Sequence, residues 1–149
     1  MPRRNKNLFA FFCLLLATNL AVAADSQRHQ RIDGMDIYFG VIPAQMTQSQ
    51  RSNMHGGADN TEHRYHVLLA LFDSKSGERI SDASVNASVA QLGMIGETKV
   101  LEPMPGGVLS YGNYFVMHKP DYYRIGFEIQ RAKGGDKTVA KFVYQRPRD

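Results

Sequence analysis

The chain has almost no thiol chemistry. Its single cysteine, Cys13, lies inside an apolar run near the N-terminus. We predict that this run is removed on export, which leaves a product without cysteine. Disulfides, thiol nucleophiles and thiolate metal ligands are then excluded. Because Phe12 stands where lipid attachment requires a small residue, a lipoprotein is not expected.

Long hydrophobic runs are also absent. The strongly apolar stretch covers residues 8–17, which is short of the roughly 20 residues that span a bilayer. It follows Arg3, Arg4 and Lys6 and ends in the small residues of 21–24. This order predicts a cleavable secretory signal over 1–24, a single domain over 25–149 and a periplasmic location.

The excess of positive charge does not belong to the exported domain. The whole chain has 18 basic and 14 acidic residues, and three of the basic ones lie in the predicted signal, which leaves a net charge of +1. A nearly neutral domain does not favour nucleic acid as a partner.

Motifs for catalysis are missing. The sequence has no nucleophile elbow, no phosphate-binding glycine loop and no dinucleotide fingerprint. Its acidic residues are scattered singly. We therefore expect a protein that is not an enzyme.

Apolar residues that alternate with polar ones are present almost throughout, and this period of two predicts strands. We expect strands within 35–41, 65–72, 83–89, 99–104, 111–117, 123–129 and 139–144, separated by turns that contain glycine or proline. The segment 65–72 is apolar on both faces, as in a central strand. The pattern predicts an all-β fold, an antiparallel immunoglobulin-like β-sandwich of about seven strands.

A polar stretch over 47–61 has no periodicity and is predicted as a long loop, a kind of segment that is often functional. Met54 and His55 lie in it beside two glycines. These two potential ligands can fold over a site.

Methionine and histidine are the soft ligands that remain, with six of the seven methionines and all five histidines outside the predicted signal. Thioether and imidazole suit copper, above all Cu(I). Met35 is expected to pack in the core, and His29 to be a solvated side chain. His63 and His66 should point to opposite faces of one strand, with His66 as a hydrogen-bonded histidine rather than a ligand.

Several short motifs resemble one family of exported proteins. They are Gly34-Met35-Asp36-Ile37, Pro43-Ala44-Gln45-Met46, the strand that follows His63, Leu101-Glu102-Pro103-Met104, Tyr111-Gly112 ahead of Met117, and the segments 122–129 and 141–144. The chain is similar here to the periplasmic accessory proteins of ferrous-iron uptake. The resemblance implies an immunoglobulin-like, copper-binding, dimeric protein that works beside a membrane iron permease.

The resemblance also implies a ligand set, which this chain matches in part. The family binds its metal through a histidine with a glutamate two positions later, a methionine after a proline, and a histidine before the Tyr-Gly pair. His63 and Met104 match, whereas Tyr65 and Ser110 replace the glutamate and the second histidine. We therefore predict a softer site for copper or iron, centred on His63 and Met104. Met54 and His55, with Met117 or His118, would complete it.

Two other functions are compatible with the sequence. The domain is alternatively a non-metal interaction module that docks on a membrane transporter or redox complex, with methionines that only pack. The weakest alternative is a carrier of small ligands with a tyrosine-rich surface at Tyr111, Tyr114, Tyr122 and Tyr123, although such tyrosines usually pack across strands.

Overall fold

The computed structural model describes residues 27–46, 62–104, 111–132 and 134–148. The predicted signal over 1–24 and the predicted loop over 47–61 lie outside these residues. The described part contains eight strands: β1 (His29–Ile32), β2 (Met35–Pro43), β3 (Arg64–Asp73), β4 (Ser84–Gln91), β5 (Glu97–Pro103), β6 (Tyr111–Val116), β7 (Tyr122–Gln130) and β8 (Thr138–Gln145). Among the described residues there is no helix with the length and apolar character needed to cross a membrane.

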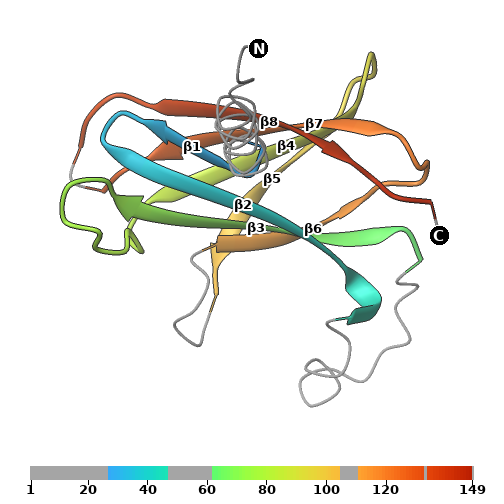
Figure 1. Cartoon of the computed structure of the whole chain (residues 1–149), viewed down its shortest axis with the longest axis horizontal. Helices are drawn as coiled ribbons and strands as arrows, with labels where there is room; N and C mark the ends of the chain where they lie inside the picture. The colour runs from blue at the N-terminus through green and yellow to red at the C-terminus, as the bar shows by residue number, and fades with distance from the viewer. Residues whose placement is uncertain (1–26, 47–61, 105–110, 133, 149) are drawn as a thin grey trace, which may run out of the picture.

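All strand pairs are antiparallel, in the order β1-β2-β3-β6-β5-β4-β7-β8. Strand β5 connects the two halves, because its residues 97–101 pair with β4 and its residues 102–103 pair with β6. The sheet folds over on itself, so that β1 approaches β8 (Figure 1). The Gln30 side-chain amide donates to the Lys141 carbonyl across this gap at 2.8 Å.

The prediction of an all-β antiparallel fold is confirmed. The described residues form eight strands rather than about seven, in a nearly closed sheet. The additional strand is β1. The assignment to an immunoglobulin-like sandwich stays a prediction.

The core lies between the two halves of the folded sheet. On β7 the alternating residues Tyr123, Ile125, Phe127 and Ile129 are all buried, as their period of two predicts. Strand β3 differs, because five consecutive residues from Tyr65 to Leu69 are buried. Its outer face, which contains His66 and Leu68, is therefore covered as well as its inner face.

Strand β1 is held by a cluster of polar side chains on the outside of the sheet. Arg31 donates to both carboxylate oxygens of Asp36, at 2.8 and 2.9 Å. His29 Nε2 lies 2.8 Å from Asp36 Oδ1, and the His29 ring stacks on Tyr38 with centroids 4.3 Å apart. The prediction that His29 is a solvated side chain is wrong, since its ring packs between strands.

These contacts predict a pH dependence of the β1–β2 pairing. The hydrogen bonds from Arg31, followed by those from His29, hold the pKa of Asp36 below its usual value. The stabilisation is thus present above the unfolded-state pKa of about 3.9 and is lost as the pH falls through the lower folded-state pKa. Asp36→Asn should lower the unfolding midpoint near neutral pH, and the difference from the wild type should shrink in acid.

Thermal unfolding as a function of pH measures this effect. Glu128→Gln is the matched control, because Glu128 forms only an exposed ion pair with Lys137 and should give little pH-linked difference. A constant difference between Asp36→Asn and the wild type at every pH would contradict the assignment.

Candidate metal centre

The residues predicted as ligands are distributed over several places. Met54 and His55 lie outside the described residues, as does Ser110. Met117 is fully buried in the core, with 0% exposure. His63 and His118 do come together, with ring centroids 5.6 Å apart in an edge-to-face arrangement.

His63 lies just before β3 and has a left-handed backbone, with a φ of 58°. Its Nδ1 lies 3.1 Å from a nitrogen of Arg146, and its Nε2 lies 3.5 Å from Glu62. The strand alternation used in the sequence prediction therefore stops one residue short of His63. Each ring nitrogen of His63 thus has a charged neighbour of its own, a guanidinium at Nδ1 and a carboxylate at Nε2.

His63 and Met104 are at different ends of the β3–β6 pairing. The His63 carbonyl accepts a hydrogen bond from the Met117 amide, whereas the Met104 sulfur lies over Gly112. The five residue steps from Gly112 to Met117 correspond to about 16 Å along an extended chain. One metal ion cannot bridge this distance. The described residues also contain no group of three or more His, Cys, Asp or Glu side chains that could hold a metal.

Two soft donors do converge, on the outer face of β3 and β6. His66 Nε2 lies 2.5 Å from the point that a Cβ of Gly112 would occupy, and Met104 Sδ lies 2.9 Å from the same point. The two donor atoms are separated by no more than the sum of these distances. On one ion the two donor atoms would be at most about 4.3 Å apart, because metal–nitrogen and metal–sulfur bonds are about 2.0 and 2.3 Å long, and this separation lies within that upper limit.

Strand pairing explains how His66, Gly112 and Met104 come together. His66 is opposite Tyr114, and Leu68 is opposite Gly112, so all four share one face of the β3–β6 pair. Glu102 of β5 is opposite Gly112 on its other side, and Met104 follows two residues later. The missing side chain of Gly112 leaves the space into which the imidazole and the thioether extend.

The imidazole of His66 is held firmly in this place. It stacks on the ring of Tyr114 with centroids 4.4 Å apart and an interplanar angle of 7°. The Arg64 guanidinium lies 5.5 Å from the centroid of the same Tyr114 ring. His66 is buried, with an exposed fraction of 7%. This packing limits rotation of the ring and points Nε2 towards Gly112.

The carboxylate of Glu102 lies at the solvent-exposed edge of this group of donors. Glu102 shares the face of Gly112 through their direct pairing, and its side chain is exposed. Sequence reasoning missed both Glu102 and His66. The alternation of β3 did place His66 on one face with Leu68, but nothing local in the sequence shows that Gly112 and Met104 lie above that face.

The arrangement can bind a soft or borderline ion. An imidazole nitrogen and a thioether sulfur suit Cu(I), and an added carboxylate extends the set towards harder ions. The half-buried Met104 and the exposed Glu102 leave a side open to solvent. An ion bound there could therefore exchange.

Comparisons with known proteins show which solved structures share this fold. No protein-family model matches the chain, and no curated protein matches it. Among solved structures, FetP of uropathogenic Escherichia coli strain F11, expressed in the periplasm, matches with a TM-score of 0.64 and 10% identity over 80% of this chain and 93% of that one. A copper-bound variant of the protein P19 of Campylobacter jejuni matches with a TM-score of 0.63 and 10% identity over 80% and 94%.

A third structure is a DUF4426 family protein of Pseudomonas aeruginosa, with a TM-score of 0.61 and 16% identity over 82% of this chain and 95% of that one. A copper-bound variant of FetP is also among the similar structures. At these identities the likeness shows a shared fold. The resemblance predicted from the sequence is confirmed at that level.

Proposed function

We propose that the chain is an exported metal-handling protein that binds a copper ion through His66 and Met104 and supports iron or copper transport in the periplasm. The observation that carries the proposal is the convergence of an imidazole nitrogen and a thioether sulfur on the space above Gly112. The predicted signal at the N-terminus and the copper-bound proteins of similar fold support it.

The donor set departs from the one expected by position. His66 takes the role that the sequence assigned to His63, while Met104 keeps its role. Glu102 supplies the third donor, because it shares the face of Gly112 and is exposed enough to reorient. This ligand set needs neither Tyr65, which is buried in the core at 4% exposure, nor the pair His63 and His118.

The residues around the proposed site have different roles in binding and in release of the ion. Tyr114 fixes the imidazole, so that little conformational freedom is lost when an ion binds. Met104 and Glu102 stand on the solvent side, at the end of β5. Bound copper would supply a charge and redox centre there. This placement suits delivery to a partner, such as a membrane permease, better than permanent storage.

Titration with Cu(I) against a competing chelator tests the proposal. His66→Ala should weaken binding by about 100-fold or more, because it removes one of two soft ligands. His63→Ala is the matched control, since it removes a half-buried histidine only three residues away and should change the affinity little. The alternative of a non-metal interaction module predicts no stoichiometric copper binding by the wild type.

A further inference from the structure

The hairpin between β4 and β5 has three large apolar side chains that are exposed to solvent. Leu92 is 57% exposed, Met94 61% and Ile95 102%. Figure 1 shows this hairpin (yellow, upper right) as it projects beyond the body of the sheet. A side chain as exposed as Ile95 contributes almost nothing to folding. The apolar character of this turn therefore points to an external partner.

The conformation of the hairpin is fixed by several backbone contacts. Gly93 has a φ of +80°, which favours glycine, and the Met94 amide donates to the Gln91 carbonyl at 2.9 Å. Arg124 of β7 donates to the Met94 carbonyl at 3.3 Å. At Gly96, any Cβ would collide with the Val89 carbonyl oxygen. These contacts fix the backbone of the apolar tip, residues 92–95, while the side chains of Leu92, Met94 and Ile95 stay exposed.

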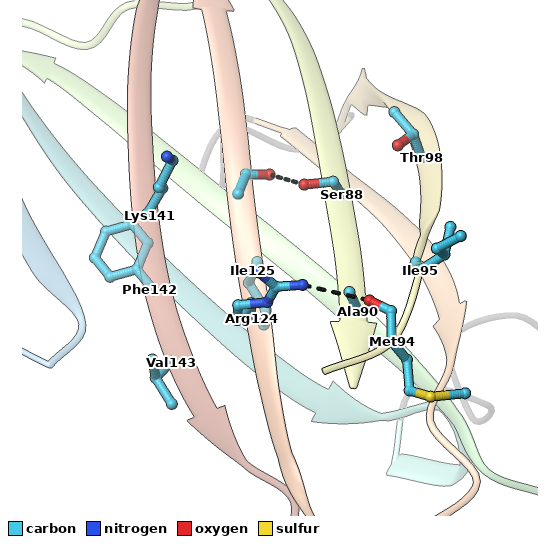
Figure 2. A pocket seen from close by; sticks show the side chains of 12 residues that line it. Ser88, Ala90, Met94, Ile95, Thr98, Arg124, Ile125, Lys141, Phe142 and Val143 are labelled. Carbon is cyan, nitrogen blue, oxygen red and sulfur yellow. Dashed lines mark hydrogen bonds between the residues drawn. The ribbon is translucent and has the colours of Figure 1, made fainter. Parts of the chain in front are cut away.

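A groove of about 530 Å³ lies between this tip and the outer face of β7 and β8. Figure 2 shows Met94 and Ile95 on one side of it, Lys141 and Val143 on the other, and Arg124 between them. Arg124 and Lys141 are the charged residues in its lining, and no carboxylate is among the described residues that line it.

The acidic residues near the hairpin are already engaged. Glu97 forms an ion pair with Lys99 at 2.9 Å. Asp121, at the base of the hairpin, accepts hydrogen bonds from Gln91 at 2.6 Å and from the Tyr122 amide. Asp121 keeps its negative charge, whereas the groove lining itself has Arg124 and Lys141 and is cationic.

We infer that this hairpin docks the protein on an anionic lipid bilayer. The tip inserts among the acyl chains near the headgroups, and the groove receives an anionic headgroup against Arg124 and Lys141. Interfacial segments combine apolar insertion with basic residues in this way, and they reach about 5–10 Å into the boundary. The inference does not depend on copper binding.

Vesicle co-sedimentation tests the inference with protein purified from the periplasmic fraction of expressing cells. The wild type should bind vesicles of phosphatidylethanolamine and phosphatidylglycerol, bind phosphatidylcholine vesicles more weakly, and lose affinity as salt screens the charges. Ile95→Asp should reduce binding by about tenfold or more, because it removes an inserted apolar side chain and adds a repelled charge. Lys141→Glu should reduce binding to the anionic vesicles alone.

Val116→Asp is the matched control. Val116 is an exposed valine, 43% accessible, at the end of β6 in the other half of the sheet, and its variant should bind vesicles like the wild type. Equal binding by Ile95→Asp and the wild type would overturn the inference, as would an equal loss in Val116→Asp. Absence of vesicle binding by the wild type would also overturn it. So would a change from dimer to monomer in Ile95→Asp without any change in vesicle binding, because the tip would then join two copies of the chain.

Discussion

Replacing Gly112 with alanine is expected to weaken copper binding by about 100-fold or more while the sheet stays folded. The new methyl group would take the space into which His66 Nε2 and Met104 Sδ extend, and it would also meet a Leu68 methyl at 3.1 Å. The Met104 side chain can bend away, but the imidazole is held by Tyr114 and can move only with its stacking partner. Displacing a ligand even modestly costs affinity steeply, because metal geometry is strict.

Gly40→Ala provides a matched control for this variant. Gly40 is opposite Leu68 on β2, so it flanks the same leucine from the other side. A Cβ there would meet only Leu68 at 4.0 Å, which is ordinary contact. Chelator competition with Cu(I) should show wild-type affinity for Gly40→Ala. Wild-type affinity in Gly112→Ala as well would show that the space above Gly112 is not the metal site.

Replacing Phe127 with alanine is expected to lower the free energy of unfolding by about 3–5 kcal/mol, the usual cost for a fully buried phenylalanine. Phe127 has 0% exposure on β7. Its ring centroid lies 6.3 Å from that of Phe39 on β2 and 5.9 Å from that of Phe142 on β8. These rings connect the two halves of the folded sheet, so their loss leaves a cavity where the halves meet.

Urea unfolding, with the linear extrapolation of the free energy, measures this loss. Val139→Ala is the control, because Val139 is 46% exposed on β8 and its truncation should cost less than about 1 kcal/mol. A similarly small loss in Phe127→Ala would contradict the role given to the ring cluster. At temperatures where Phe127→Ala is folded, its copper affinity should equal that of the wild type, since Phe127 faces the opposite side of the sheet from Gly112.

The strands could be predicted from the sequence where alternation is long and strong. Strand β7 matches its prediction to within a residue at each end. Strand β1 was missed because it has only four residues, three of them polar. Its stability comes from the contacts of His29 and Arg31 with Asp36, and such contacts between separate segments leave no periodic signal.

The proposed metal site could be predicted only in part. Met104 belongs both to the site predicted from the sequence and to the site proposed from the structure, and the choice of thioether and imidazole ligands followed from composition. His66 was interpreted as a hydrogen-bonded histidine rather than a ligand, because a strand pattern gives the face of a residue but not its neighbours. Its neighbours depend on β6 pairing with both β3 and β5, an order that β-strand connections do not reveal locally. His63 was favoured because its position matches the ligand histidine of the family that the sequence resembles.

Cu(I) titration of His66→Ala beside His63→Ala decides whether copper binds at His66 and Met104. His66→Ala should lose about 100-fold or more in affinity, while His63→Ala should stay within a few-fold of the wild type. Full affinity in His66→Ala together with a large loss in His63→Ala would contradict copper binding at His66 and return the site to the position predicted from the sequence.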